Sequence, residues 1–166
     1  MSAGKRRLDS YDLKILAMLQ KDANIPISAL ADAVNLSTTP CWRRVKALRE
    51  SGVISGEVAL LDPVSVNLGM TVFVAVRTRN HTAEWFDHFR GAIEAIPEVI
   101  ELHRLSGDID YLLRVVVPDI KAYDDVYKRL IRAVELEDVS SSFVMETVKT
   151  STALPLDYVQ SIPQSS

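Results

Sequence analysis

The chain has 166 residues, of which 48% are hydrophobic and 25% are charged, and its formal net charge is −3. This composition fits one globular domain or two small ones, and it argues against extensive disorder, a membrane span, a signal peptide or a disulfide framework built on the single cysteine. Residues 1–55 hold nine Lys/Arg and five Asp/Glu, a net of +4, whereas residues 56–166 hold ten and seventeen, a net of −7. A basic module therefore precedes an acidic one, as expected if only the first part meets a polyanion.

Three helices are predicted in the basic module. Asp9 is placed to cap the first helix, with Asp12 as a weaker capping-box partner three residues later. Ser28 is expected to cap a short second helix, and Asn35, which tolerates the left-handed conformation of a tight turn, follows it. Ser37 is expected to cap the third helix.

The third helix is expected to end at Gly52, and residues 53–61 are expected to form one or two short strands. Pro40 is compatible with this helix because it falls in the first turn. Three helices with a short turn between the last two, followed by a hairpin, predict a winged helix-turn-helix.

The third helix carries the strongest functional signal. Its apolar residues Cys41, Val45 and Leu48 share one helical stripe, and residues 37–49 also contain four cations and no acid. Such a helix can dock on a small core and present its charge to phosphates, although a solvated basic face is the plainer alternative. The candidate DNA-binding residues are Ser37, Thr38, Thr39, Trp42, Arg43, Arg44, Lys46 and Arg49.

These candidates divide by position. Arg44 and Arg49 are expected over the flanking DNA backbone. The residues expected to face base edges or phosphates are Thr38, Thr39, Trp42, Arg43 and Lys46. Trp42 has a second interpretation, in which it packs along its own helix. Cys41 is either a redox-sensing thiol or a small buried filler, and its place on the apolar stripe favours the filler. The basic residues 5–7 form an arm that would add non-specific affinity.

Beyond an expected hinge at residues 62–69, the pattern changes to that of a second domain. The predicted elements are a strand at 70–78, a helix over 85–96 that Pro97 stops, strands at 99–106 and 109–117, a helix that Asp119 caps, and a strand at 141–149. The order βαββαβ is the ferredoxin-like arrangement, with two helices on one face of an antiparallel sheet. The other face would be left bare, so we expect dimerisation through the sheet.

The turn between the two central strands is the second candidate site. Gly107 lets a ligand or a neighbouring backbone come close, and Asp108 or Asp110 could pair with an ammonium group. Exposed backbone N–H groups could bind a carboxylate, which would complete the two fixed ends of an α-amino acid. A plain hairpin turn with two solvated acids remains the alternative at this point.

Signals for catalysis or metal binding are weak. His81, His88 and His103 are scattered without the spacing of a metal site. The sequence contains no Ser/His/Asp order, phosphate-binding loop or dinucleotide fingerprint, and the acids near the end of the helix over 85–96 are interpreted as a solvated cluster. We therefore predict that the protein is not an enzyme.

Several motifs together resemble those of the Lrp/AsnC family of bacterial and archaeal regulators, also called feast/famine regulatory proteins. One is the Gly-Asp-Ile-Asp-Tyr run that begins at Gly107. The motifs occupy residues 8–16, 33–48, 58–63, 107–114 and 141–149, so the resemblance spans nearly the whole chain.

The resemblance implies an α+β chain with an N-terminal winged helix-turn-helix and a C-terminal ligand-sensing domain. It also implies dimers that pair through the sheet and often assemble into tetramers or octamer rings around double-stranded DNA. An amino-acid effector would bind between dimers near the turn, which makes the turn a site rather than a plain hairpin. The implied effector-binding residues are Leu105, Ser106, Gly107, Asp108, Asp110 and Tyr111.

Finer features resemble one branch of the family. The segments 38–42, 84–85, 123–130 and 154–155 resemble the cysteine-responsive regulators that activate cysteine detoxification. Motifs shared with other branches leave leucine and methionine open as effectors.

The sequence thus predicts a cytoplasmic, nucleoid-associated transcriptional regulator with no cofactor, metal or membrane partner. The expected parts are a winged helix-turn-helix at 1–55, a strand and hinge linker at 56–70, a ferredoxin-like sensing and dimerisation domain at 71–150, and a tail at 151–166. The alternative is a stand-alone amino-acid-binding module that contacts other proteins without binding specific DNA. The positive charge of the first part argues against it.

Overall fold

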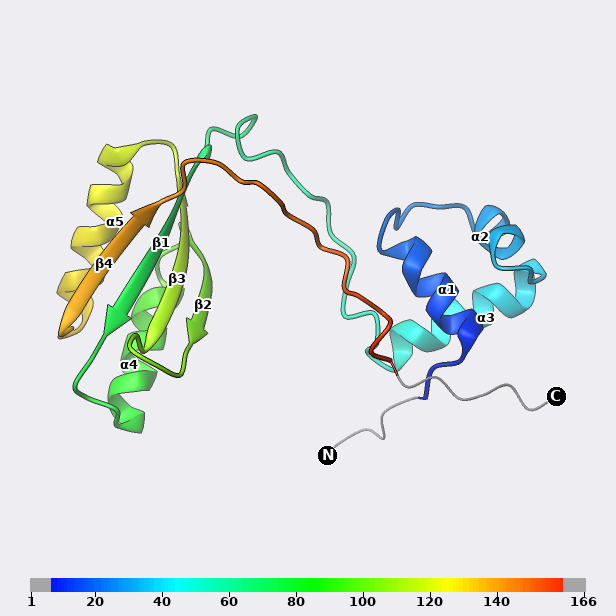
Figure 1. Ribbon diagram of the computed structural model, residues 1–166, viewed down its shortest axis with the longest axis horizontal. Coiled ribbons are helices and arrows are strands. Elements are labelled where there is room, and N and C mark those ends of the chain that lie inside the picture. The colour runs from blue at the N-terminus through cyan, green and yellow to red at the C-terminus, as the bar shows by residue number, and fades with distance from the viewer. Residues whose placement is uncertain (1–6, 160–166) are drawn as a thin grey trace. The chain divides into compact units, whose positions relative to one another are not determined.

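The computed structural model describes residues 7–159, which belong to two compact units (Figure 1). The first unit comprises Met1–Ala59 together with Lys149–Ser166, and the second is Leu60–Val148. The chain therefore passes from one unit to the other twice. Of the predicted basic arm at residues 5–7, only Arg7 lies among the described residues. None of the described helices has the length and hydropathy that a membrane crossing requires.

The first unit contains the three predicted helices, α1 at Ser10–Leu19, α2 at Ile27–Ala33 and α3 at Thr38–Glu50. The capping box of α1 is confirmed, since the Asp12 N–H donates to Asp9 Oδ1 at 2.9 Å and the Asp9 N–H donates to Asp12 Oδ2 at 3.4 Å. Asn35 has a φ of 56° in the turn before α3, and Gly52 has a φ of 72° just after it. The sequence predicted the left-handed turn at Asn35 and the end of the third helix at Gly52.

The ends of α2 and α3 differ from the prediction in detail. Pro26, not Ser28, is the N-cap of α2, because the Pro26 carbonyl already accepts the first helical bond from the Leu30 N–H at 2.9 Å. Ser37 does occupy the N-cap of α3, but its side chain makes no capping hydrogen bond. The Ser37 hydroxyl is exposed to solvent at this end of the helix.

The predicted hairpin after α3 is wrong for the described chain, because residues 53–61 form no strand. A strand requires a partner to which its backbone groups can bond, and Val58 and Leu60 of this segment are 82% and 72% exposed. The segment is attached to α3 only near its start, where the Ile54 N–H donates to the Leu48 carbonyl at 3.1 Å.

The C-terminal segment completes the first unit. The Leu154 N–H donates to Gln20 Oε1 at 2.7 Å, and Gln20 Nε2 donates to the Leu154 carbonyl at 3.2 Å. Leu156 packs against the buried cluster that α1, α2 and α3 share. The last described residues of the chain therefore contact the end of its first helix.

The second unit has the predicted βαββαβ order (Figure 1). Its elements are β1 at Met70–Arg77, α4 at Ala83–Glu94, β2 at Val99–Arg104, β3 at Tyr111–Val117, α5 at Ile120–Ala133 and β4 at Asp138–Phe143. The sheet is antiparallel, with the strand order β2-β3-β1-β4. The last strand is displaced from the predicted 141–149, because the ladder with β1 runs from Asp138 to Phe143.

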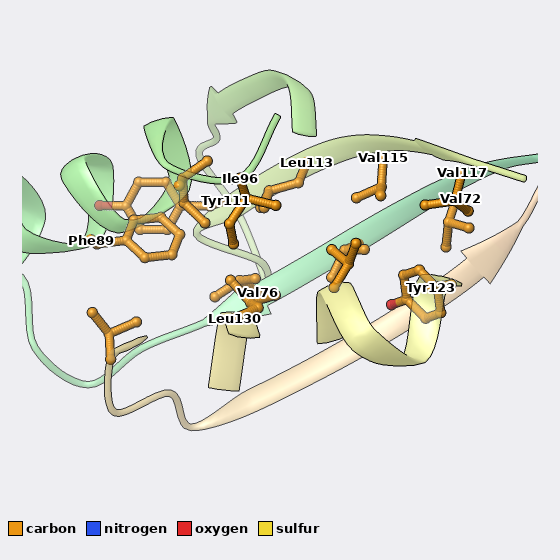
Figure 2. Packing of buried hydrophobic residues seen from close by; sticks show 14 residues of the cluster. Val72, Val76, Phe89, Ile96, Tyr111, Leu113, Val115, Val117, Tyr123 and Leu130 are labelled. Carbon is orange, nitrogen blue, oxygen red and sulfur yellow. The ribbon is translucent and has the colours of Figure 1, made fainter. Parts of the chain in front are cut away.

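One face of this sheet packs against both helices. Val72, Val74 and Val76 of β1 lie beside Leu113 of β3 and Phe89 of α4 in one buried cluster (Figure 2). The Asp119 carboxylate caps α5 by accepting from the Ala122 N–H at 2.8 Å, as predicted. The helices therefore cover a single face, and the ferredoxin-like arrangement is confirmed.

The opposite face is mixed rather than uniformly apolar. Phe73 and Ile100 are 37% and 48% exposed on it. Arg114 of β3 pairs with Phe73 on one side and Glu101 on the other; its Nη1 lies 2.8 Å from Glu101 Oε1, and His103 Nε2 lies 3.1 Å from Glu101 Oε2. His103 and Arg114 together lower the pKa of Glu101. A partner on this face would have to match one charged cluster as well as apolar side chains.

Candidate nucleic-acid interface and effector turn

Helix α3 buries the apolar stripe that the sequence predicted. Cys41 and Leu48 are 0% exposed and Val45 is 4% exposed, and all three belong to the cluster of the first unit. Leu36, just before the helix, is partly buried against the same cluster. Burying one stripe fixes the rotation of α3 and so determines which of its polar residues face solvent.

The exposed face of α3 carries most of the predicted DNA-binding residues. Trp42 is 51% exposed. Arg43 is also exposed and makes no ion pair or hydrogen bond with any other described residue. The exposed candidates are Ser37, Thr38, Thr39, Trp42, Arg43, Lys46 and Arg49.

Two of these cations have weak partners within the unit. Lys46 Nζ lies 3.6 Å from Glu50 Oε1 and 5.4 Å from the centre of the Trp42 ring. Arg49 Nη2 lies 2.6 Å from Glu57 Oε1. Exposed ion pairs are typically worth about 0–1 kcal/mol, so a phosphate can replace either carboxylate at little cost.

Arg44 differs from the other cations, because its side chain faces into the unit. Its Nη1 lies 2.7 Å from Asp9 Oδ2 and 2.8 Å from Asp12 Oδ1, and the guanidinium carbon lies 5.3 Å from the centre of the Tyr11 ring. The Asp12 side chain is only 3% exposed. We expected Arg44 over the DNA backbone, but the structure pairs its charge with the two acids that cap α1.

This pairing stabilises the ionised form of the acids. Burial acts to raise the pKa of Asp9, but the Asp12 N–H and the Arg44 guanidinium outweigh burial and hold that pKa below its usual value. A carboxyl with a lowered pKa stabilises the fold above its unfolded-state pKa and loses that contribution as the pH falls through the folded value. The junction between α1 and α3 therefore weakens as the pH falls through the pKa of Asp9.

Cys41 has the environment of a structural residue. It is the chain's single cysteine and is buried. Burial raises the pKa of its thiol in spite of the nearby Arg44 charge, so the reactive thiolate is disfavoured. The filler interpretation is therefore supported over a redox-sensing thiol.

The predicted effector turn is closed by its own backbone. The Leu105 N–H donates to the Asp110 carbonyl at 2.8 Å, and the Asp110 N–H donates to the Val76 carbonyl at 3.0 Å. Gly107 has a φ of 128°, a value that residues with a side chain rarely adopt. The candidates Leu105, Ser106, Gly107 and Asp108 are all exposed at this turn.

The other two effector candidates lie deeper. Asp110 Oδ2 accepts a hydrogen bond from the N–H of Thr78, the residue that follows β1, at 2.8 Å. Tyr111 is 2% exposed, and its ring lies 5.0 Å from that of Phe89 and 5.9 Å from that of Trp85. The structure thus gives Tyr111 a place in the core beneath the turn, not on its rim.

The sequence did not indicate the cavity beside this turn. Its volume is about 770 Å³, and it is lined by residues 78–82, Trp85 and residues 135–137. The lining comes from two loops that are distant in the chain, one before α4 and one after α5. The sequence analysis noted the Glu-Trp pair at 84–85 only as a resemblance to one branch of the family. No sequence pattern indicates that this pair lies close to residues 135–137. Among residues 7–159, no group of three His, Cys, Asp or Glu is arranged to hold a metal ion.

Comparisons with known proteins agree for both units. A model of the Lrp/AsnC ligand-binding domain matches residues 71–154, and a model of a winged helix-turn-helix DNA-binding domain matches residues 8–55. The chain is 49% identical over 151 residues to the DNA-binding transcriptional activator DecR of Escherichia coli K12, a match that covers 90% of this chain and 99% of that protein.

Two solved structures are similar over most of their length. The structure of an AsnC-family transcriptional regulator from Agrobacterium tumefaciens has a TM-score of 0.88 and 56% identity, and the match covers 91% of this chain and 99% of that one. A transcriptional regulator of Neisseria meningitidis, solved in complex with L-Met, has a TM-score of 0.86 and 36% identity, with coverages of 90% and 97%.

The neighbours Arg43 and Arg44 provide a matched test of the first unit's stability. We expect Arg44→Ala to lower the free energy of unfolding by about 3 kcal/mol, because the buried Asp12 carboxylate loses its guanidinium. Arg43→Ala should change it by less than about 0.5 kcal/mol, because Arg43 is exposed. Urea unfolding followed by circular dichroism measures both, and equal stability of the two variants would contradict the structural role of Arg44.

The burial of Cys41 predicts slow thiol chemistry. Ellman's reagent should label the native protein far more slowly than the urea-unfolded protein, which should titrate to one thiol per chain. Fast labelling of the native protein would show that the thiol is accessible and would revive the redox interpretation.

Proposed function

We infer the function of this chain from its family, since it belongs to the Lrp/AsnC family and is a DNA-binding transcriptional regulator with an amino-acid-binding domain. The relatives matched are regulators rather than enzymes. What remains to be proposed is how this chain's own residues bind DNA, how copies of it associate, and which amino acid they sense.

The exposed face of α3 is the observation that carries the DNA-binding proposal. Thr38, Thr39, Trp42, Arg43 and Lys46 would enter the major groove, with Arg43 as the reader of guanine and Lys46 as a phosphate contact. Ser37 and Arg49 would contact the flanking backbone from the two ends of the helix. Arg44 would act indirectly, by holding α3 against α1.

Copies of the chain are proposed to pair through the uncovered face of the sheet. This proposal is supported by the exposed Phe73 and Ile100 on that face and by the family to which the chain belongs. A dimer would present two α3 helices to successive major grooves, about 34–36 Å apart, so operators should be pseudo-palindromic. Tetramers or octamers would follow from further contacts between dimers, as the resemblance implies.

The second unit is proposed to sense a free amino acid near the turn at 105–111. Cysteine is the first choice, because segments 38–42, 84–85, 123–130 and 154–155 resemble the cysteine-responsive branch. Methionine and leucine are retained, and the L-Met bound to the Neisseria meningitidis regulator supports a free amino acid as the ligand class. Binding would change the assembly and so its DNA affinity, a coupling typically worth about 1–3 kcal/mol.

Two substitutions on α3 test the proposed DNA-binding face. We expect Arg43→Ala to weaken binding and to relax sequence preference at one base pair in each half-site, because a bidentate contact to guanine is worth about 1–3 kcal/mol of discrimination. Lys46→Ala should weaken binding to all sequences and reduce the slope of log K against log salt by about one.

Both changes are measured by gel shift on a selected operator and on scrambled DNA, at several salt concentrations. Lys21→Ala is the matched control, because Lys21 is an exposed cation of the first unit that lies outside α3. Unchanged specific binding in both α3 variants would show that α3 is oriented differently. An absence of any specific DNA binding would instead favour the stand-alone amino-acid-binding module.

Calorimetry identifies the effector. The purified full chain is titrated with each proteinogenic amino acid under reducing conditions, and we expect saturable heat from cysteine. Heat from leucine or methionine but not from cysteine would contradict the assignment to the cysteine-responsive branch, while a free amino acid would remain the ligand class. Silence from all three would reject the assignment.

A further inference from the structure

The C-terminal segment, residues 149–159, gives the first unit a second connection to the rest of the chain. The first connection follows α3, where the Ile54 N–H bonds to the Leu48 carbonyl and Arg49 forms an ion pair with Glu57. The second connection is made where the C-terminal segment contacts the end of α1. The first unit is therefore anchored at two places that are far apart in its sequence.

A single side chain, that of Gln20, holds the backbone of the C-terminal segment. Its Oε1 accepts from the Leu154 N–H at 2.7 Å, and its Nε2 donates to the Leu154 carbonyl at 3.2 Å. A carboxamide offers one acceptor and one donor side by side, so it can satisfy both backbone groups of one residue. Gln20 thus bonds to the segment as a neighbouring strand would, and it fixes the residue at which the segment is held.

The residues after this contact favour the docked conformation. Leu156 is partly buried against the cluster that α1, α2 and α3 share, and its carbonyl accepts from the Val159 N–H at 3.1 Å. Pro155 lies between Leu154 and Leu156. Proline fixes its own φ and biases the preceding residue towards an extended backbone. The undocked segment therefore has fewer conformations to lose when it docks.

The connection between this anchor and the sheet is short. The Val144 N–H, just after β4, donates to the Thr71 carbonyl of β1 at 3.0 Å. The intervening residues 145–153 form no helix or strand. Even when fully extended, the chain from Val144 to Leu154 spans at most about 35 Å. A docked segment is therefore a short tether between β4 and α1.

Two anchors restrict the motion of the first unit more than one anchor does. A body held at one point by a flexible chain can turn in every direction about that point. A second anchor at a different point restricts rotation to the line that joins the two, within the slack of the connections. The connection through residues 55–69 contains no helix or strand, and Val58 and Leu60 in it are 82% and 72% exposed. This connection by itself would leave the first unit free to turn.

We propose that the docked C-terminal segment acts as a second tether that sets the half-site spacing the protein accepts on DNA. This inference rests on the proposed pairing of chains through the sheet and on the proposed contact of α3 with the major groove. Once one first unit of a dimer is bound, the other binds intramolecularly, and its effective concentration depends on the length and stiffness of the connections. Doubly anchored units are concentrated at one spacing, whereas singly anchored units also reach neighbouring spacings. Gln20 and Leu156 are therefore positioning residues for operator recognition.

The tether is tested by lengthening it without changing its contacts. An insertion of Gly-Ser-Gly-Ser between Lys149 and Thr150 leaves the anchoring residues in place and adds about 14 Å of reach. The same four residues appended after Ser166 are the matched control. Binding of the full-length proteins is measured by gel shift on a selected pseudo-palindromic operator and on copies with two base pairs inserted or removed at its centre. Each change moves one half-site by about 7 Å along the duplex and about 70° around it.

The spacing penalty is the ratio of the dissociation constant for an altered operator to that for the selected operator. We expect a penalty of about tenfold or more for the parent protein and for the control with the appended residues. The penalty of the insertion variant should fall below about threefold, while its affinity for the selected operator stays within about threefold of the parent value.

Removal of the anchor should have the same effect as lengthening the tether. Gln20→Ala combined with Leu156→Ala removes both backbone bonds and the packing contact, so the spacing penalty should again fall below about threefold. Ile15→Val is the control for stability, because it removes one buried methyl group from the same cluster and keeps Gln20 and Leu156. Urea unfolding should show that Ile15→Val is destabilised, yet its spacing penalty should equal that of the parent protein.

Two results overturn the tether and leave the proposed DNA binding intact. One is a spacing penalty in the insertion variant equal to that of the parent protein, a result that does not depend on whether the doubly substituted variant folds. The other is a parent protein that binds its operator specifically but accepts all three spacings equally. If the parent protein shows no specific DNA binding at all, the proposed function fails and the tether fails with it.

Discussion

A guanidinium in the middle of α3 is held by the two carboxylates that cap α1, and the orientation of the exposed face of α3 depends on this contact. Arg44 and Asp12 meet at 2.8 Å where little solvent reaches. The pair fixes the rotation of α3 together with the buried stripe at Cys41, Val45 and Leu48. Arg43, one residue earlier, is then directed to solvent without a partner among the described residues. The two adjacent arginines thus have different roles: Arg44 holds α3 against α1, and Arg43 is exposed on the surface of α3. A change in the residues that cap α1 would therefore alter the orientation of the exposed face of α3.

Local features of the sequence predicted much of the fold. The capping box at Asp9, the left-handed Asn35 and the cap at Asp119 each involve groups within three residues or the conformation of one residue. The apolar runs at 70–78 and 109–117 likewise predicted two strands, which the structure has as β1 and β3. The predictions that were wrong depended on contacts between residues far apart in the sequence. Arg44 reaches carboxylates 35 and 32 residues away, and no local pattern distinguishes it from the other cations of α3. The hairpin at 53–61 lacked a partner strand, which no pattern within the segment could reveal.

The candidate effector site could likewise be predicted only in part from the sequence. The turn at Gly107 could be predicted because a glycine followed by two acids separates two apolar runs, and its backbone closure agrees with a turn there. The cavity beside it was not visible, because its walls come from loops separated by most of the domain. Asp110 is the residue common to both, with its backbone in the turn and its side chain on the cavity loop. Tyr111 supports them from below, packed among the rings of Trp85 and Phe89. A short path of hydrogen bonds and ring contacts therefore connects the turn with the cavity.

The contact between Gln20 and Leu154 has a consequence for the order in which the protein matures. Leu154 and Leu156 are translated after every residue of the second unit, yet they complete the first unit. When all three N-terminal helices have left the ribosome, the nascent chain still lacks the C-terminal segment that bonds to Gln20 at the end of α1. The same holds for any product of a frameshift or of proteolysis that ends within the second unit. The first unit thus reaches its full set of contacts only in chains that also carry the whole second unit.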